Sequence, residues 1–437
     1  MVANNNIEIP WQEPLHFAQK ISDNYCGESW IFLYSGLNEK LDKKNSYLAI
    51  FPREKIICED FFAAEKILKN SEERWFGYFS YEVAHDFEKF PKTKKSFIDL
   101  PKIWLMNFDL VFEFDHKKKK LMAIFSDKKL LEKVTRWTIK KDKVDRISSS
   151  EFLSNFTDSS YLKTISKIKE MIARGDLYQT NLTRKFFGEF KQKQNQQSAF
   201  KTFIDLTKIN PANYSSFLKL GENFIISSSP ELFFQIKNRK IISRPIKGTA
   251  PRGFDTKSDR QNKLDLKKSP KERAENLMIV DLVRNDLSRI CKAGTVIVKK
   301  LFSINTYKTI HHMSSEIHGE LSEDCSNIDA LQACFPPGSM TGAPKIKAME
   351  IAAKEEKINR GIYSGAIGFI DRKSANFSVV IRTLIFQGKK FEVQTGGAIT
   401  FDSDPQKELE EIFSKAAPLI RITSSSSKFF NHCEKHS

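Results

Sequence analysis

Apolar residues in the first third of the chain occur in short runs that are separated by polar turns. Two runs, 30–36 and 75–81, are rich in aromatic and β-branched residues, which is typical of strands. Two others, 110–115 and 121–125, flank four consecutive lysines and predict a β-hairpin. We therefore expect mixed strands and turns in this region.

Helical periodicity begins further along the chain. Residues 161–174 place apolar side chains three and four positions apart, and Gly175 is a typical helix stop. Ser269 and Pro270 are a typical N-cap and first helical residue, and they predict a helix that runs to Arg289. Further helices are expected after residues 338–344 and from Asp404, and strands at 178–182 and around 367 and 380.

Composition suggests how these elements are grouped. Residues 145–158 are polar and serine-rich and predict a linker between an N-terminal region, 1–145, and a larger region, 155–420. The serine-rich tail, 421–437, is expected to be disordered. The chain of 437 residues is 40% hydrophobic, with 36 phenylalanines for a core, and has no apolar run long enough to span a membrane.

Charge and cysteine content narrow the functional classes. Six cysteines without a C-x-x-C spacing, and a polar N-terminus without a signal-peptide pattern, predict a reduced cytoplasmic protein. The net charge of +17 allows a nucleic-acid-binding protein as one alternative. The lysines are spread along the chain, however, and no nucleic-acid-binding motif is present, so a solvated basic face that favours an anionic substrate is the preferred interpretation.

One lysine lies in a constrained setting. Lys247 stands between Pro245, which fixes the backbone, and Gly248, which permits a positive φ or the close approach of a ligand. Held in a cleft near other cations, such a lysine could act as a nucleophile. The alternative is a strand-end lysine that faces water.

Two pairs of glutamates predict an oxygen-lined metal site. Glu272 and Glu275 are three residues apart on one predicted helix, as are Glu408 and Glu411 on another. Carboxylates without His or Cys suit Mg²⁺. The simpler alternatives are a capping box closed by Glu272 and an exposed ion pair between Glu411 and Lys415.

Several blocks of sequence resemble one enzyme family. The blocks are P-I-K-G-T at 245–249, S-P-E-L-F at 229–233, A-E-x-x-M-x-V-D-L-x-R-N-D at 274–286 and E-x-x-E-x-x-x-K at 408–415. They resemble the chorismate-utilising enzymes, and the resemblance is dense over 161–419. The family implies an α+β fold in which two large, mainly antiparallel sheets pack face to face with helices outside, as in anthranilate synthase component I. The N-terminal third is expected to add strands to the same assembly.

The resemblance also implies roles for individual residues. Lys247 matches the nucleophilic lysine of the aminodeoxychorismate synthase component I branch, where anthranilate synthases have alanine. Glu231 matches the general acid that protonates the leaving hydroxyl, and His312 matches a histidine that contacts substrate. Glu275 and Glu411 are then direct Mg²⁺ ligands, and Glu272 and Glu408 act through water.

The remaining site residues are expected to bind chorismate. Gln179 stands where the isochorismate and salicylate synthases carry a water-activating lysine, so the chain resembles the ammonia-using members. The other expected contacts are Asn181, Thr249, Thr341, Gly342, Ala343, Tyr363, Arg382, Gly396, Gly397, Ala398 and Lys415.

The function implied is the amination of chorismate to 4-amino-4-deoxychorismate for para-aminobenzoate and folate synthesis. A separate glutamine amidotransferase subunit is expected to supply ammonia, because no glutaminase block is recognisable in this chain. The alternative within the family is anthranilate synthase component I.

Overall fold

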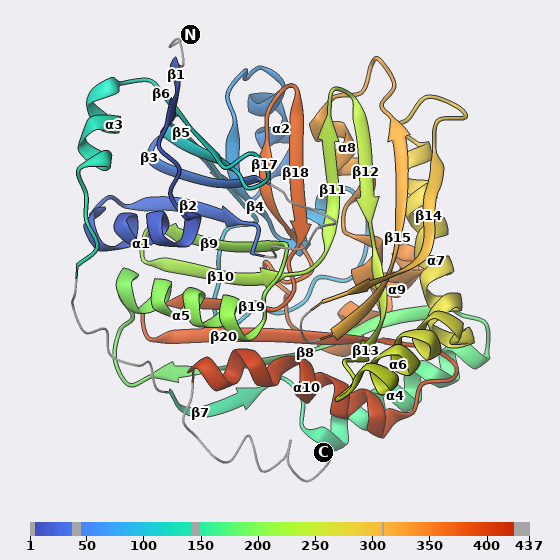
Figure 1. Ribbon diagram of the computed structural model, residues 1–437. Coiled ribbons are helices and arrows are strands. Elements are labelled where there is room, and N and C mark those ends of the chain that lie inside the picture. Colours follow the sequence, from blue (N-terminus) through green and yellow to red (C-terminus); the bar gives the residue numbers. More distant parts are fainter. Residues whose placement is uncertain (1–4, 37–44, 141–148, 308–309, 424–437) are drawn as a thin grey trace.

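The computed structural model describes residues 5–36, 45–140, 149–307 and 310–423, and it shows an α+β protein (Figure 1). Ten α-helices are present in these residues: α1 (Pro14–Asn24), α2 (Phe61–Lys69), α3 (Lys128–Thr135), α4 (Asp158–Ala173), α5 (Gln196–Ile209), α6 (Thr256–Lys268), α7 (Pro270–Ser288), α8 (Asn327–Cys334), α9 (Lys345–Glu356) and α10 (Pro405–Thr423).

Antiparallel strands form two sheets that are joined through one long strand. The first sheet runs in the order β1 (Asn5–Ile9), β6 (Lys120–Phe125), β5 (Ile103–Asp115), β3 (Asn45–Cys58), β2 (Ser29–Tyr34), β9 (Tyr214–Leu220), β10 (Asn223–Ser229), β19 (Thr383–Gln387), β20 (Lys390–Ile399) and β8 (Gln179–Phe190). At its end, β8 also pairs with β7 (Ser149–Ser154) and with the two-residue β16 (Gly342–Ala343).

The second sheet branches from β5, which pairs with β3 along one edge and with β4 and β6 along the other. It continues through β4 (Trp75–Phe79), β17 (Ala366–Ile370), β18 (Ser374–Val379), β11 (Leu232–Lys237), β12 (Lys240–Arg244) and β15 (Ile310–Glu320). β15 in turn pairs with β13 (Ile246–Pro251) and β14 (Ile297–Thr306).

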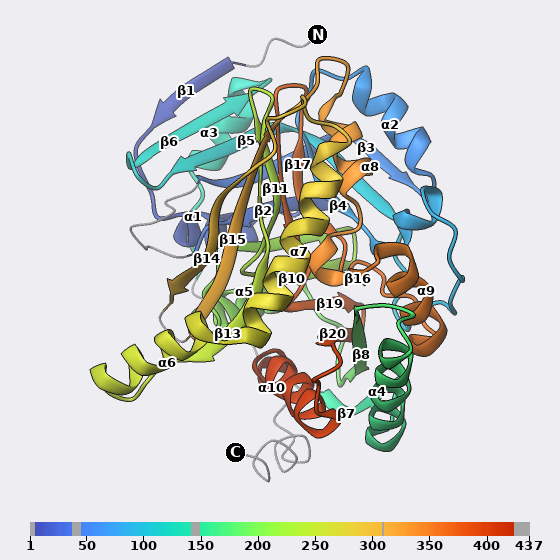
Figure 2. The ribbon, with the colours of Figure 1, turned by 90° about the vertical axis from the view of Figure 1, so that its right-hand side faces the viewer.

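The two sheets pack face to face around a core to which, among the described residues, only strands and loops contribute. Ile31 and Leu218 of the first sheet share one buried cluster with Phe76 and Phe369 of the second. The outer faces are covered by helices: α1, α3 and α5 on the first sheet, α2, α7 and α8 on the second, and α4 and α10 along β8 and β20 (Figure 2). The predicted fold class is therefore confirmed, with the addition that β5 belongs to both sheets.

Several predicted elements form for the expected local reasons. The side-chain oxygen of Ser269 accepts a hydrogen bond from the Glu272 backbone and starts α7, with Pro270 as its first residue. Helix α4 is capped by Thr157 and ends before Gly175, whose φ is +83°. The expected hairpin is the β5–β6 pair.

Other predictions were wrong. Residues 149–154 are not a linker but strand β7, which pairs with β8 and packs Phe152 edge-on against Phe391 with ring centroids 5.1 Å apart. The N-terminal third contains helices α1, α2 and α3 besides strands and turns. Residues 421–423 belong to α10 rather than to a disordered tail, and the rest of the predicted tail lies outside the described residues.

The N-terminal and later strands are hydrogen-bonded to each other directly: β2 pairs with β9, and β4 with β17. In the part of the chain that the structure describes, no helix is both long enough and apolar enough to cross a membrane. The five cysteines of that part are free thiols.

A buried ion pair ties an N-terminal loop to the end of the first sheet. The side chains of Lys185 on β8 and Glu392 on β20 are 1% and 2% exposed, and their charged atoms lie 3.1 Å apart. The second oxygen of Glu392 accepts hydrogen bonds from Ser96 Oγ and the Ile98 backbone, both at 2.7 Å. The Lys185 ammonium also donates to Ser96 Oγ and to the Asn359 carbonyl. Both charges are thus compensated inside the protein.

Removing one partner of this pair should be costly. Lys185→Met or Glu392→Met leaves an uncompensated buried charge, and we expect each to lower the free energy of unfolding by about 3–5 kcal/mol. The double variant should lose clearly less than the sum of the two, because it leaves neither charge unpaired. Urea unfolding measures all three; additive losses in the double variant would contradict this account.

Candidate active site

Lys247 lies on β13, where the second sheet approaches helix α7. Gly248 has a φ of +92°, and a Cβ at this position would lie 2.9 Å from Glu272 Oε2, so the lysine strand can lie against the carboxylate only because the next residue is glycine. The charge of the Lys247 ammonium acts to lower the pKa values of four carboxyl groups, those of Glu231, Glu272, Glu275 and Glu411, although burial outweighs it in the first three. The lysine therefore faces both the predicted acid and the predicted metal ligands.

Glu231 lies in the turn between β10 and β11, and its side chain is buried, with 4% of the residue exposed. Its Oε1 accepts a long hydrogen bond of 3.5 Å from the Ile246 backbone. Burial raises the pKa of Glu231 to about 7, even though Ser339 and Lys247 act in the opposite direction. A carboxyl group with this pKa still carries its proton in a large fraction of molecules at neutral pH, as a general acid requires.

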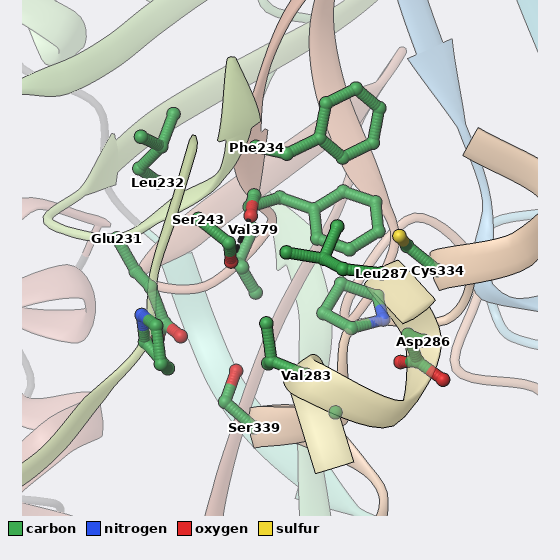
Figure 3. Close-up of a pocket in the computed structure, with 14 residues that line it drawn as sticks. Glu231, Leu232, Phe234, Ser243, Val283, Asp286, Leu287, Cys334, Ser339 and Val379 are labelled. Atoms are coloured by element: carbon green, nitrogen blue, oxygen red, sulfur yellow. Dashed lines mark hydrogen bonds between the residues drawn. The ribbon is translucent and has the colours of Figure 1, made fainter. Parts of the chain in front are cut away.

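A small pocket with a mainly apolar lining lies beside Glu231, and these apolar neighbours contribute to its desolvation. Figure 3 shows Glu231 and Ser339 at one side of this pocket, with Val283 and Leu287 of α7 and Cys334 of α8 beyond them. The pocket does not include Lys247 or the four glutamates of the predicted metal site. Glu231 thus lines an apolar pocket and is also close enough to Lys247 for that charge to act on its pKa.

Two helices bring the four glutamates of the predicted metal site together. Glu272 and Glu275 lie on α7, and Glu408 and Glu411 lie on α10. The charge of Glu411 raises the pKa values of the other three glutamates, which shows that the pairs from the two helices are close. Burial is the larger cause, and it acts in the same direction.

Lysines partly neutralise this group of carboxylates. The Lys271 ammonium lies 4.0 Å from Glu275 and 3.9 Å from Glu408, between the two helices. Burial acts to raise the pKa of Glu411, but the Lys415 ammonium, 2.6 Å away, outweighs it and the net shift is downward. Together with Lys247, these lysines leave the four carboxylates only partly compensated.

The donor set fits Mg²⁺. Within the described residues, no group of three or more His, Cys, Asp or Glu side chains is close enough to enclose a metal with protein atoms alone. Mg²⁺ has no need of such a group, because it keeps several waters and takes one or two carboxylates together with substrate oxygens. Glu275 and Glu411, one from each helix, remain the predicted ligands.

Of the two simpler explanations for these glutamates, the structure excludes the capping box of Glu272 and contains the ion pair of Glu411. The Ser269 backbone N–H donates to the Asp265 carbonyl at 2.8 Å, so Glu272 closes no capping box and its carboxylate faces Gly248 instead. The ion pair between Glu411 and Lys415 does form, and the two side chains are 50% and 39% exposed, as that alternative expects. Lys415 also donates a 2.8 Å hydrogen bond to the Gly396 carbonyl, which ties this ion pair to β20.

The adjacent histidines His311 and His312 have different environments because successive side chains of β15 point to opposite faces. Both ring nitrogens of His311 have partners at 3.0 Å, Asp259 and Thr306. His312 is also buried and contacts Thr249 Oγ1 at 3.0 Å through Nδ1, but its Nε2 has no partner. His311 is therefore structural, and His312 is the histidine available to a ligand.

Burial lowers the pKa of His312 to about 3, and the positive charges of Arg382 and Lys415 act in the same direction. These two predicted carboxylate-binding cations are therefore close enough to His312 for their charges to act on it. Arg382 has a φ of +52° and donates from Nη1 to Asn210 Oδ1 at 2.7 Å. Tyr363 is buried, and the charge of Glu231 adds to the desolvation that raises its pKa.

The remaining predicted contacts meet at the end of the first sheet. Gly342 and Ala343 form β16 and pair with Thr180 and Gln179 of β8. The Asn181 backbone N–H donates to the Thr341 carbonyl at 2.8 Å. The Gln179 side-chain oxygen is buried and has no partner. On the other edge of β8, Gly396, Gly397 and Ala398 pair with residues 181–183, and a Cβ on Gly397 would lie 2.9 Å from Glu408.

The structure therefore brings the predicted site residues into one region, and it adds three that the sequence analysis missed. Lys271 is four residues before Glu275, a spacing that could have revealed it. Ser339, which faces Glu231, lies in the segment 338–344 that was singled out only as a helix approach. Asn210, the partner of Arg382, is 172 residues away in sequence, and no local signal marks it.

Comparisons with known proteins bear on this site. The family model described as chorismate binding enzyme matches residues 28–421. The chain is 31% identical over 384 residues to anthranilate synthase component 1 of Lactococcus lactis, covering 84% of this chain and 83% of that protein. It is 36% identical over 349 residues to aminodeoxychorismate synthase component 1 of Salmonella typhimurium, covering 79% and 75%.

A solved structure of a family member has a similar fold. Anthranilate synthase component I from Streptococcus pneumoniae superposes with a TM-score of 0.77 at 26% identity, over 87% of this chain and 93% of that one. The resemblance drawn from the sequence blocks is confirmed. The chain belongs to the chorismate binding enzyme family, within the group that contains anthranilate synthase component I and aminodeoxychorismate synthase component I.

Proposed function

We propose that this protein is the chorismate-aminating component of an aminodeoxychorismate synthase. The observation that carries the proposal is the position of Lys247, which faces the acid Glu231 and the carboxylates of α7 and α10 at once. A nucleophile beside both the proton donor and the metal ligands can reach the substrate ring while the ring is anchored and its leaving group is protonated.

The reaction is a displacement in two steps. The Lys247 amine adds to C2 of chorismate, the two ring double bonds shift, and the C4 hydroxyl departs with a proton from Glu231 as water. Ammonia then adds to C4, the double bonds shift back, and the bond to Lys247 breaks. The net change replaces the hydroxyl of C4 with an amino group and regenerates the lysine.

The remaining residues of the predicted site are expected to bind the substrate. When bound, Mg²⁺ would supply positive charge for the ring carboxylate, held by Glu275 and Glu411 and, through water, by Glu272 and Glu408. Arg382 with Tyr363, and the backbone around Gly396 to Ala398, suit the enolpyruvyl side chain and its carboxylate. The unpaired Nε2 of His312 and Oε1 of Gln179 suit hydrogen bonds to substrate or ammonia.

Ammonia would come from a separate glutamine amidotransferase subunit. The relatives of both kinds are named as component 1, which implies a second component for each of them. After amination a separate lyase would release para-aminobenzoate for folate synthesis.

Anthranilate synthase component I is the second candidate, because the relatives divide between the two names. That reaction requires ammonia to attack C2, the same atom that the proposal assigns to Lys247. A lysine bonded to C2 blocks this attack and directs ammonia to C4. Lys247 therefore favours aminodeoxychorismate over anthranilate.

The product distinguishes the two candidates. With chorismate, Mg²⁺ and ammonium, we expect the unmodified chain to form aminodeoxychorismate without pyruvate, measured by product mass and a coupled pyruvate assay. Lys247→Ala should slow this reaction and shift the product toward anthranilate with pyruvate release, because C2 is then open. Replacement of ammonium by glutamine should stop product formation by the single chain. Rapid anthranilate and pyruvate formation by the unmodified chain would reject the proposal and leave the family assignment intact.

The acid role of Glu231 predicts a pH dependence. Its raised pKa of about 7 means that the protonated, active form is lost as pH rises through neutrality, so kcat should fall above about pH 7. Glu231→Gln should lower kcat by about 10²–10⁴-fold and remove this descending limb. Total ammonium must be adjusted at each pH to hold free ammonia constant. An unchanged descending limb in Glu231→Gln would assign the titration to another group.

The metal proposal has a matched control on the same helix. Glu275→Gln and Glu411→Gln should abolish Mg²⁺-dependent turnover and weaken Mg²⁺ binding by calorimetry, because each removes one anionic ligand. Asp281→Asn removes the same charge from the exposed face of α7, where Asp281 pairs with Arg284, and should leave both measurements unchanged. Full activity in either glutamine variant would remove that residue from the metal site.

A further inference from the structure

A buried arginine with no part in the proposed chemistry binds both backbone segments of the substrate-binding end of the cleft. Arg360, which is 2% exposed, follows α9. Its Nη2 donates to the Asn181 carbonyl and its Nη1 to the Met340 carbonyl, each at 2.8 Å. One guanidinium group thus connects β8, which carries Gln179 and Asn181, with the segment that leads into Thr341 and β16.

The guanidinium is itself held in a single orientation. Glu356, one helical turn earlier, accepts from Nε at 2.9 Å and from Nη2 at 2.7 Å in a bidentate pair. The same Glu356 Oε1 accepts a 2.9 Å hydrogen bond from the Thr183 backbone on β8. The ion pair is therefore attached to β8 at two points, the Asn181 carbonyl and the Thr183 N–H.

The N-terminal region supports the arginine from the other side. The guanidinium carbon lies 4.7 Å from the centre of the Tyr81 ring, a cation–π contact. The Glu82 carboxylate accepts a 2.7 Å hydrogen bond from the Arg360 backbone N–H. These contacts explain how a segment far from the catalytic residues in sequence contributes to the site.

The segment that Arg360 holds is also bound to β8 through its own backbone, and the Tyr178 N–H donates to the Ala343 carbonyl at 2.9 Å. β16 is two residues long and pairs with β8 through Gly342 and Ala343. Next to it, the Asn181 backbone N–H donates to the Thr341 carbonyl at 2.8 Å. Arg360 adds a second link between the two segments, because its planar fork of donors binds the Asn181 and Met340 carbonyls at the same time, which a single ammonium does less well.

We infer that Arg360 is a positioning residue that sets the distance between the Gln179–Asn181 strand and the Thr341–Ala343 segment, and so the geometry of chorismate binding. The inference rests on the proposed substrate site but not on which amination product is formed. It acts through backbone carbonyls, without contact between Arg360 and substrate.

The test is Arg360→Lys, with Arg184→Lys as the matched control. Arg184 is another buried arginine, paired with Asp158 at 2.6 Å and bonded to the Phe156 carbonyl at 2.9 Å, but these partners lie around β7 and α4 rather than at the cleft. Both variants exchange a guanidinium for an ammonium at a buried arginine that pairs with a carboxylate. Thermal unfolding reports the loss of stability in each.

Chorismate consumption with ammonium and Mg²⁺ gives KM and kcat whatever the product. We expect Arg360→Lys to raise KM and to lower kcat/KM by about 10–100-fold, because displacement of binding groups by about 1 Å costs this much. Arg184→Lys should lose stability with KM unchanged. A purely structural role for Arg360 would reduce the active fraction, and so kcat, without changing KM, and this result would overturn the inference.

Two further measurements keep the outcome decisive. If Arg360→Lys does not fold, Tyr81→Leu is the substitute, because it removes the ring beneath the guanidinium and keeps the ion pair. It should raise KM by a smaller factor, and an unchanged KM would overturn the inference.

If the unmodified chain consumes no chorismate, the proposed function fails. Equilibrium dialysis with chorismate still tests Arg360, because we expect weaker binding in Arg360→Lys but not in Arg184→Lys.

Discussion

The repulsion among four glutamate carboxylates in a partly buried cleft is the constraint on which the rest of this site depends. Burial and neighbouring negative charge raise the pKa values of Glu272, Glu275 and Glu408, so the ionised state of the group is costly without cations. Lys271 and Lys415 offset part of this cost. An anionic substrate would add to the repulsion, and a site of this kind can bind a dicarboxylate only when a further cation lies between carboxylates and ligand. This repulsion is therefore the physical reason for proposing a divalent cation at the site.

The two helices that carry these carboxylates are held in place, despite the repulsion, by packing on different sheets. Helix α7 packs on the second sheet through Ile279, Val280 and Val283, whereas α10 packs against the end of the first sheet through Leu409 and Ile412. The two carboxylate pairs are therefore anchored to different sheets, and their separation is set by the packing of one sheet on the other. Buried ion pairs, Lys185 with Glu392 and Arg360 with Glu356, lie where the sheets, the N-terminal loops and α9 meet. They fix geometry at a place where an apolar core could not provide directional contacts.

The parts of the structure that the sequence predicted are those with local causes. Ser269 and Pro270 start α7 through contacts within one helical turn, and the E-x-x-E spacings place the glutamates without tertiary information. The parts that it missed depend on distant partners. Strand β7 is polar by composition and forms because β8 offers an edge for pairing. His311 and His312 could not be separated until the register of β15 was known, and the ligands of Arg360 lie 4, 20 and 179 residues away.

The different pKa values of Glu231 and His312 also determine which of the two can transfer a proton near neutral pH. Desolvation acts on Glu231 and His312 alike, but it favours the neutral form of each, so it raises one pKa to about 7 and lowers the other to about 3. At neutral pH His312 is an uncharged imidazole, which can accept or donate a hydrogen bond through its free Nε2 but holds no second proton to give. Glu231 is the group of this pair that can both hold and release a proton near neutrality. Pairs of titratable groups whose environments separate their pKa values in this way reveal the division of acid and hydrogen-bonding roles. The same burial that suits Glu231 to the proposed acid role therefore leaves His312 as a neutral hydrogen-bonding group.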